Sequence, residues 1–521
     1  MITAMQPPVV SLADIQSKYD AVVRENAQLR TQLAWFKRQV FGQKSEKRHI
    51  ASSEQGILGE GFAEKPDNPA PGKKTRIAEH EREKKSKDFA GDETKLFFDE
   101  AKVPVEVIEV NNPEIEGIPA DQIDIIGEKV SHRLAQRPGS YVILKYVRKV
   151  AKRRDTQALS CAPAPAGVID GSRADVSFIV GLLVDKLVYH LPFYRQHQRL
   201  AAAGIRVSRP WLTQIGQSAI ALIEPIFEAQ LASIRSSRVI KMDETPIKAG
   251  LAGPGKMKTG QMWPVMGQED EICFLFHPGR STDVVHAILG DKPPDDAVLH
   301  TDGYIVYARY AQKTGIAHAQ CWAHCRREFF EARNIEPGRA EEALQAIAGL
   351  YAVEAEVRER NLTGQAKREK RQEKAMPIAK RFFAWVDKQF EGQGFLPSSP
   401  FTKALAYARE RKEGLMLYLI DPDVDIDTND LERALRVIPM GRKNWLFCWT
   451  ELGARQVGIM QSLLVTCKLH EIDPYDYLAD VLQRIGQHPA SRVHELTPKM
   501  WKRLFAGNPL RSPLHQATTF A

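Results

Sequence analysis

The chain has 521 residues, of which 43% are hydrophobic, so it is too long for a single core and is expected to form several domains. Its net charge of +8 and pI near 9.0 favour a polyanionic partner such as nucleic acid. The sequence lacks the long apolar run of a membrane span and a signal-peptide pattern, and its 6 cysteines are scattered. We therefore expect a cytoplasmic protein with reduced thiols and no membrane partner.

The first predicted element is an N-terminal helix within residues 1–44. Apolar residues recur three and four positions apart from Leu12 to Val40, which is the spacing of a coiled-coil seam. Asn26 falls at an a position, where a buried Asn controls register in parallel two-stranded coils. We expect a homodimer through residues 11–42, and an amphipathic helix packed on its own chain is the alternative.

A flexible basic linker and a small β-rich domain are predicted next. Residues 45–94 are polar, charged and contain several prolines, so they cannot bury enough apolar area to offset their ordering entropy. Residues 95–166 alternate apolar and polar side chains, most clearly at 103–110 and 141–150. We expect one basic face on this sheet, which either contacts a phosphate backbone or is simply solvated. That face comprises Lys145, Arg148, Lys149, Lys152 and Arg153.

Residues 167–230 are predicted to be helical, with a pattern like a helix-turn-helix. Gly204 suits the turn, and Ser208 and Pro210 suit the start of the following helix. Arg209 at that start is a candidate DNA contact. A helical hairpin that does not touch DNA is the alternative.

Three acidic residues stand in separate, recognisable contexts. The apolar run 239–242 ends at Asp243, and the run 297–301 ends at Asp302. Glu432 lies near the start of a predicted helix. Oxygen ligands from two strand ends and one helix can hold a pair of hard divalent cations, Mg²⁺ or alternatively Mn²⁺, and so support phosphoryl transfer.

The order of predicted elements around these acids matches the opening of a ribonuclease H-like fold. Three hairpin strands precede a helix and a fourth strand that bears Asp302. We expect this core to be interrupted by a helical insertion and followed by a loosely ordered tail. The boundaries are 231–335 for the first part of the core, 336–422 for the insertion, 423–485 for the second part and 486–521 for the tail.

Glu432 has a purely structural alternative. With Asn429 as N-cap, it would be the third helical residue, from which a Glu commonly bonds back to the cap. Leu431, Leu435 and Ile438 would then form the buried stripe of the helix. The sequence therefore leaves open whether Glu432 is a ligand or a capping residue.

A set of motifs, in a specific order, identifies a family that the chain resembles. They are Asp302-Gly-Tyr304, Cys321-Trp-Ala-His324 with Arg326-Arg327, Glu432-Arg-Ala-Leu-Arg436, Gly441-Arg-Lys-Asn-Trp-Leu-Phe447, Asp473-Pro-Tyr-Asp-Tyr-Leu478 and Asp185-Lys-Leu-Val-Tyr-His-Leu-Pro-Phe-Tyr-Arg195. With these motifs the chain resembles the DDE transposases of the insertion sequence 66 (IS66) family.

The resemblance implies a ribonuclease H-like catalytic domain, magnesium dependence and cut-and-join chemistry at the ends of a mobile element. It implies Asp243, Asp302 and Glu432 as catalytic carboxylates, and companion proteins of the same element as partners. Family members commonly carry two Cys-x-x-Cys pairs before the Ala-Pro-Ala-Pro segment, whereas Cys161 stands alone there. One thiol cannot make a tetrahedral zinc site, so we expect no zinc and a degenerate zinc-binding domain.

The sequence thus predicts a cytoplasmic DNA transposase that is associated with the bacterial nucleoid. A nuclease that cuts without joining and an inactive dimeric repressor of the element are the alternatives. The predicted phosphate contacts near the acids are Arg433, Arg436, Arg442 and Lys443.

Overall fold

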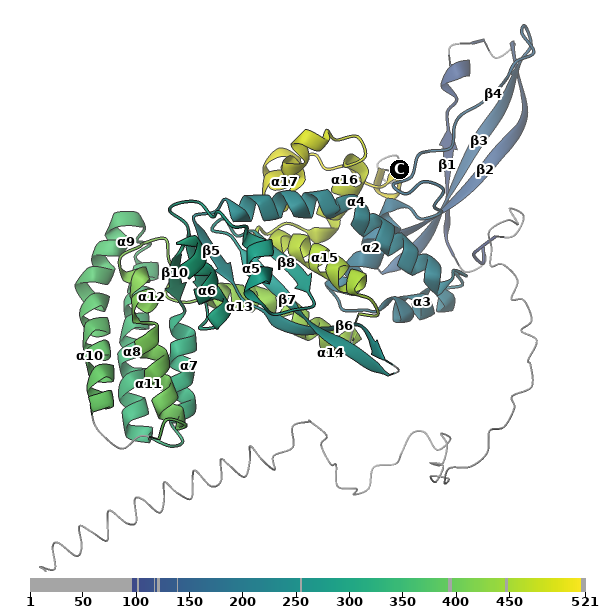
Figure 1. The fold of residues 1–521 in the computed structure, drawn as a ribbon. Helices are drawn as coiled ribbons and strands as arrows, with labels where there is room; N and C mark the ends of the chain where they lie inside the picture. Colours follow the sequence, from purple (N-terminus) through teal and green to yellow (C-terminus); the bar gives the residue numbers. More distant parts are fainter. Residues whose placement is uncertain are drawn as a thin grey trace, which may run out of the picture. The chain divides into compact units, whose positions relative to one another are not determined.

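The structure is a computed structural model, and it describes residues 96–100, 103–116, 118–119, 122–137, 139–253, 255–391, 396–445 and 448–516. Apart from residues 333–337, the described residues belong to one compact unit. The predicted coiled coil (11–42) and linker (45–94) lie outside them. Sheets and helices form a multidomain α/β architecture, as predicted (Figure 1). No described helix has the length and apolar character needed to cross a membrane.

The first sheet lies in the region predicted to be β-rich. Its strands are β1 (Val105–Val110), β2 (Ile123–Arg137), β3 (Ser140–Arg153) and β4 (Leu159–Cys161). β3 is central, with β1 parallel to it and β2 and β4 antiparallel. The sequence did not predict β2, which is the longest strand of this sheet.

The single basic face predicted for this sheet is wrong. β3 runs through its pairing with β2 without an extra residue of its own, so its side chains alternate between the two faces. Lys145 and Lys149 therefore lie on one face, and Arg148 and Lys152 on the other. Arg148 donates to the carbonyl of Ala162 at 3.2 Å. This member of the predicted cationic surface therefore binds the protein's own backbone.

Three helices follow where the helix-turn-helix-like pattern was predicted: α2 (Val176–Leu187), α3 (Phe193–Ala202) and α4 (Arg209–Arg235). Gly204 adopts a φ of +85°, and the Ser208 hydroxyl accepts a hydrogen bond from the N–H of Trp211 at 3.3 Å. Much of α4 is buried, because it packs against α2 and the core of the next domain. DNA contact by the exposed Arg209 stays a prediction.

The second sheet carries the predicted aspartates. Its strands are β5 (Val239–Met242), β6 (Thr245–Gly253), β7 (Lys256–Met266), β8 (Ile272–His277), β9 (Val298–Thr301) and β10 (Ala317–Gln320). β5 and β6 lie along one side of β7 and β8 lies along the other, all antiparallel to it, while β5, β9 and β10 are mutually parallel neighbours. The strand predicted over 238–249 is interrupted at Asp243 and Glu244, which belong to neither β5 nor β6.

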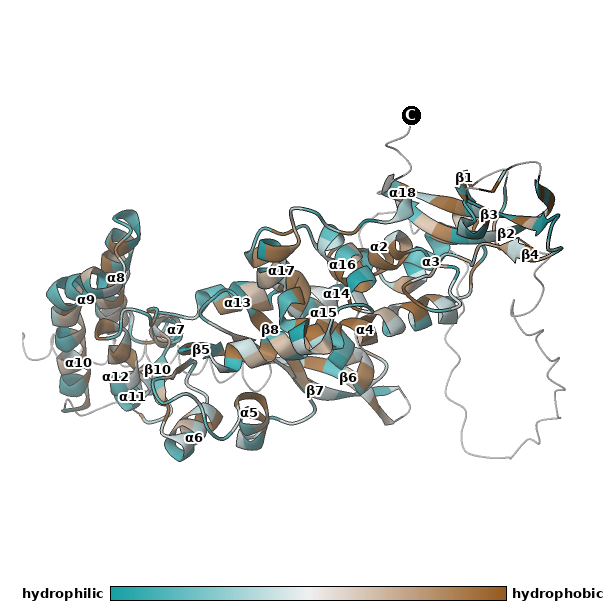
Figure 2. Cartoon of the chain, turned by 90° about the horizontal axis from the view of Figure 1, so that it is seen from above, coloured by the Kyte–Doolittle hydropathy of each residue, from teal (hydrophilic) through white to brown (hydrophobic). Residues whose placement is uncertain are grey.

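Helices complete the core around this sheet. They are α5 (Thr282–Leu289), α6 (Ile305–Thr314), α15 (Glu451–Leu469) and α16 (Pro474–Arg484). α15 packs against β8 and α4, and its long buried stretch is visible as apolar colouring (Figure 2). Gly458 makes this approach close, since a Cβ there would collide with the backbone of Phe274.

The predicted insertion is a set of packed helices between the second aspartate and the glutamate (Figure 1). An aromatic cluster that includes Trp322, Phe329, Phe382 and Phe401 holds them together. The elements of the insertion are α8 (Pro337–Glu359), α9 (Gly364–Lys370), a π-helical turn (Arg371–Ala375), α10 (Met376–Glu391), α11 (Pro400–Glu410), α12 (Lys412–Met416) and a 3₁₀ turn (Leu417–Leu419). α7 (Trp322–Ala332), which falls within the range predicted for the first part of the core, packs with these helices instead. The chain then returns to the core through α13 (Asn429–Leu435) and α14 (Val437–Trp445).

Residues 486–516, in the tail that was predicted to be loosely ordered, are instead folded. A 3₁₀ helix (Ala490–Leu496), α17 (Pro498–Leu504) and α18 (Pro513–Gln516) follow α16. Leu496, Trp501 and Leu514 are buried. These short elements gain their stability from tertiary burial rather than from local propensity, which is why periodicity did not reveal them.

A fully buried arginine braces the insertion. Arg371 forms a two-point ion pair with Glu354 at 2.8 Å for both contacts. Its Nη1 also donates to the carbonyls of Tyr418 and Val424, at 2.7 and 2.9 Å. The π-helical turn that carries Arg371 is thereby fixed to the segment that leads to α13.

Replacing Arg371 with Ala should destabilise the protein by about 3–5 kcal/mol, because Glu354 is left as a buried, unpaired charge. Urea unfolding followed by circular dichroism measures this difference. Lys374→Ala is the matched control, since Lys374 pairs with Glu356 from an exposed position and should cost at most about 1 kcal/mol. Equal effects of the two substitutions would contradict the bracing role of Arg371.

Candidate functional site

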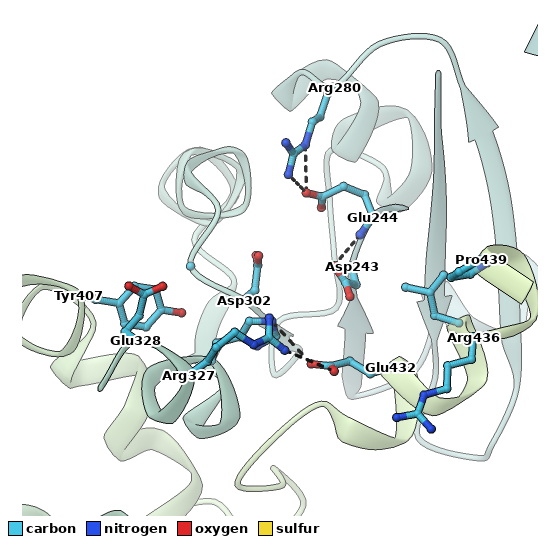
Figure 3. Close-up of a pocket in the computed structure, with 13 residues that line it drawn as sticks. Asp243, Glu244, Arg280, Asp302, Arg327, Glu328, Tyr407, Glu432, Arg436 and Pro439 are labelled. Atoms are coloured by element: carbon cyan, nitrogen blue, oxygen red, sulfur yellow. Dashed lines mark hydrogen bonds and ion pairs between the residues drawn. The ribbon is translucent and has the colours of Figure 1, made fainter. Parts of the chain in front are cut away.

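The three predicted carboxylates line one cavity of about 530 Å³ (Figure 3). Asp243 follows β5, Asp302 follows β9, and Glu432 lies on α13. Because β5 and β9 are adjacent and parallel, their carboxyl ends meet at the same edge of the sheet. The other lining residues are Glu244, Arg280, Gly303, His324, Arg327, Glu328, Tyr407, Leu435, Arg436 and Pro439.

Asp243 is the most perturbed acid of the cavity. Burial raises the pKa of its carboxyl group to about 7, although a hydrogen bond from the Glu244 N–H, at 2.7 Å, acts in the opposite direction. The nearby charges of Asp302, Glu244 and Glu432 raise the pKa further. The ionised form of Asp243 is therefore unfavourable in this cavity, first because the carboxyl is buried and second because other acids lie near it.

Asp302 is fixed by the turn that follows it. Its Oδ1 accepts a hydrogen bond from the N–H of Tyr304 at 2.9 Å. Gly303 allows the insertion to come close, because a Cβ there would collide with Arg411 and Tyr407. Arg411 donates to the Gly303 carbonyl at 2.8 Å. The Asp-Gly-Tyr motif therefore joins the second aspartate to the insertion.

The capping-box alternative for Glu432 is wrong, because α13 begins one residue earlier than expected. Thr428 is the N-cap, and Asn429 is already the first helical residue. Glu432 is thus the fourth helical residue, and its own N–H donates to the Thr428 carbonyl at 3.0 Å. The predicted buried stripe is confirmed, with Leu431 and Ile438 fully buried. The Glu432 carboxylate is left for the cavity.

A histidine and an arginine approach the Glu432 carboxylate, but neither is within hydrogen-bond distance of it. Its Oε1 is buried and has no hydrogen-bond partner among the described residues. Nε2 of His324 lies 3.6 Å from Oε1, and Nη2 of Arg327 lies 3.8 Å from Oε2. Burial lowers the pKa of His324. A buried carboxylate oxygen without a donor is costly unless another positive group meets it.

A buried lysine sets the position of this glutamate. Lys241, on β5, lies two residues before Asp243, and its ammonium group donates to Asp425 at 2.6 Å and to Asp430 at 2.5 Å. Asp430 is two residues before Glu432 on α13. The strand that delivers the first aspartate therefore also anchors the helix that delivers the glutamate.

Sequence reasoning missed the polar group behind Asp243. The side chain of Glu244 is 2% exposed and accepts hydrogen bonds from Arg280 and from the Tyr307 hydroxyl. Arg280 also lies over the ring of Tyr304, with 4.0 Å to its centroid. The position of Glu244 next to Asp243 was a usable signal, but the pairing with Arg280 and Tyr307 depends on tertiary contacts.

The predicted basic residues lie in several different settings. Arg436 lines the acidic cavity, whereas Arg433 lines a separate pocket with Asp425 and Asp430. Arg442 donates to the Pro246 carbonyl. The remaining predicted residues are absent from the lining of the acidic cavity in the described structure, namely Lys443, Lys145, Arg148, Lys149 and Arg209.

The carboxylates share a cavity without converging on one point. Within the described ranges, no group of three or more His, Cys, Asp or Glu side chains is arranged so that it could hold a metal ion. Figure 3 shows the Glu432 carboxylate directed toward Arg327. A metal ion bound by all three acids would therefore require their side chains to turn inward.

Comparison with known proteins places the chain in a family. The model "Transposase IS66 family" matches residues 171–456, more than half of the chain. The chain belongs to the IS66 transposase family. The model "IS66 C-terminal element" matches residues 462–499 of this transposase, and "Transposase C of IS166 homeodomain" matches residues 28–90.

Relatives of this transposase are found in Sinorhizobium fredii. The uncharacterized protein y4qI is 31% identical over 420 residues, which cover 76% of this chain and 75% of the relative. The uncharacterized protein y4hP is 29% identical over 404 residues, which cover 73% of this chain and 72% of the relative. These similarities extend across most of the chain.

The raised pKa of Asp243 predicts a pH-dependent stability. The folded protein retains the Asp243 proton up to about pH 7, whereas the unfolded chain releases it near pH 4, so stability falls as the pH rises through this window. From pH 5 to pH 8, the wild type should lose about 2–3 kcal/mol relative to Asp243→Asn, which has no carboxyl to ionise. Urea unfolding in EDTA at both pH values measures it. A difference that does not change with pH would contradict the raised pKa.

Proposed function

We propose that this IS66 transposase cleaves DNA at the ends of its element and joins those ends to new DNA, in a reaction that depends on Mg²⁺. The observation that carries the proposal is the shared cavity of Asp243, Asp302 and Glu432. The strand arrangement supports it. β5 and β6 together take the place of one interrupted strand, so with β7 and β8 they form three antiparallel positions, followed by α5 and the parallel strands β9 and β10. A ribonuclease H-like catalytic domain requires this order.

The side chains of the cavity fit divalent cations in their chemistry. All three donors are carboxylates, the ligand type that Mg²⁺ prefers, and Mn²⁺ is an alternative occupant. The buried Oε1 of Glu432 lacks a donor among the described residues, and burial makes the ionised form of Asp243 unfavourable, so a bound cation would stabilise both carboxylates. Asp243, Asp302 and Glu432 would hold the ions. When bound, such ions supply an activated oxygen nucleophile and stabilise the leaving oxygen of phosphoryl transfer.

The arginines around the cavity would orient the DNA. Arg280, Arg327 and Arg436 all line it, and a guanidinium group can bind a phosphate through two parallel hydrogen bonds. Arg280 is held rigidly between Glu244 and the Tyr304 ring. Arg327 contacts Glu432 only at 3.8 Å and can turn toward a phosphate. The scissile phosphate would therefore lie between a fixed and an adjustable cation.

The proposal includes the setting in which the reaction takes place. The net charge of +8 favours association with DNA and the bacterial nucleoid. Dimerisation through residues 11–42 and companion proteins of the same element remain part of the proposal.

Glu432→Gln should abolish cleavage and strand transfer while leaving the unfolding free energy within about 0.5 kcal/mol of wild type, because glutamine keeps the shape but is a poor Mg²⁺ ligand. Asp243→Asn should likewise be inactive. Labelled element ends incubated with Mg²⁺ and resolved on a sequencing gel provide the measurement. Glu451→Gln is the control and should stay active, because Glu451 pairs with Lys258 and is not among the described residues that line the cavity.

The same gel separates the rival functions. Cleavage without joining of pre-cleaved ends would indicate a nuclease. Binding to the ends without any Mg²⁺-dependent cleavage would indicate a repressor. Near-normal activity of Glu432→Gln would contradict the assignment of the third ligand.

A further inference from the structure

A second cavity, of about 490 Å³, lies beside the acidic one and shares Arg327 with it. Its lining combines cationic, aromatic and amide groups. The residues are Ala323, Arg326, Arg327 and Phe330 from α7, Tyr351 from α8 and Asn429 from α13.

The α7 residues of this cavity form a continuous stripe. Ala323, Arg326, Arg327 and Phe330 are spaced three, four and seven positions apart, so they lie on one face of the helix. The opposite face packs into the aromatic cluster through Trp322 and Phe329. The second cavity is therefore not part of the core of the insertion.

Phe330 is the unusual member of the stripe. It is 49% exposed, and the guanidinium group of Arg326 lies 5.8 Å from the centroid of its ring. A half-exposed aromatic ring beside a planar cation is the combination on which unpaired nucleobases stack in single-strand-binding proteins. Ala323 is small and leaves space beside the ring.

The far wall of the cavity is polar and ordered. The Tyr351 hydroxyl donates to Asp427 at 2.9 Å, and the Asn429 side-chain amide donates to the same carboxylate at 2.6 Å. The Asn429 side chain is thereby held in place, and its carbonyl oxygen can accept a hydrogen bond from the exocyclic amino group of a base.

We propose that this cavity receives one unpaired nucleobase of the DNA strand, stacked on Phe330, while the attached phosphate meets Arg327. Since Arg327 also lines the acidic cavity, this nucleotide is next to the phosphate that is cut. The inference rests on the proposed function, because it assigns a conformation to the DNA substrate of that site.

The test is binding of single-stranded DNA in EDTA, which excludes any contribution from catalysis. The probe is a 30-nucleotide thymidine oligomer that carries the fluorescent base 2-aminopurine at intervals. The full-length protein should quench its fluorescence, and Phe330→Ala should bind about 5- to 150-fold more weakly with little quenching. Phe330→Trp keeps an aromatic face and should retain both properties.

Phe390→Ala is the matched control. Phe390 on α10 is 36% exposed and lies beneath Arg409 at 4.9 Å, but it does not line the second cavity in the described structure. Its loss should change neither affinity nor quenching. A fully paired duplex that contains 2-aminopurine should bind wild type and Phe330→Ala equally, because its bases cannot reach the ring.

Three results would overturn the inference. In the first, Phe330→Ala quenches the fluorescence as strongly as the wild type. In the second, Phe330→Ala and Phe390→Ala lose the same affinity for single-stranded DNA, and in the third, Phe330→Ala loses as much affinity for the duplex as for the single strand. Each can occur while Mg²⁺-dependent cleavage is normal, so the proposed function would survive. Conversely, quenching that depends on Phe330 without any cleavage would contradict the proposed function and leave the nucleobase site standing.

Discussion

The geometry of the acidic cavity depends on the burial of one cation, the ammonium group of Lys241. Removing a charge from water costs several kcal/mol unless partners replace the lost solvation. Asp425 and Asp430 are those partners, and they lie 184 and 189 positions away along the chain. Because Asp430 lies on α13, its ion pair with Lys241 holds this helix next to the end of β5. The sheet and the returning segment of the insertion are therefore joined by a charge that neither could bury alone.

The same segment is held from two further directions, which makes the insertion part of the site. Arg238, at the other end of β5, pairs with Asp421 at 2.6 Å, and Arg371 binds the carbonyls of Tyr418 and Val424 from inside the insertion. Asp421 is thus neutralised by Arg238, and Asp425 and Asp430 are neutralised by Lys241. The contrast with Asp243, whose pKa is raised to about 7, is sharp. The acids that hold the segment in place have cationic partners, whereas Asp243, where cations are proposed to bind, has none among the described residues that offsets the rise in its pKa.

Local patterns were sufficient for the strand-end aspartates, because a short, mainly apolar strand pattern that leads to an acid is visible without tertiary information. They failed where the outcome depended on distant contacts. The hydrogen-bond donors to Glu244 are Arg280 and Tyr307, and no spacing in the sequence connects these two residues with Glu244. The start of α13 was misplaced by one residue, since Asn429 and Thr428 are both acceptable caps. The folded C-terminal segment exists because Trp501 is buried, not because seven residues favour a helix alone.

The Cys-Trp-Ala-His motif has a structural role, although cysteine and histidine are residue types that commonly bind metals. The N–H of Cys321 donates to the carbonyl of Thr301, directly before Asp302, at 3.1 Å. Its sulfur accepts a hydrogen bond from the N–H of Thr428, the N-cap of the helix that carries Glu432, at 3.4 Å. Burial raises the pKa of the thiol to about 11, so it stays protonated and neutral. A larger side chain at this fully buried position would push the strand end and the helix start apart, and with them the second and third carboxylates. The small size of Cys321 is therefore what this position requires.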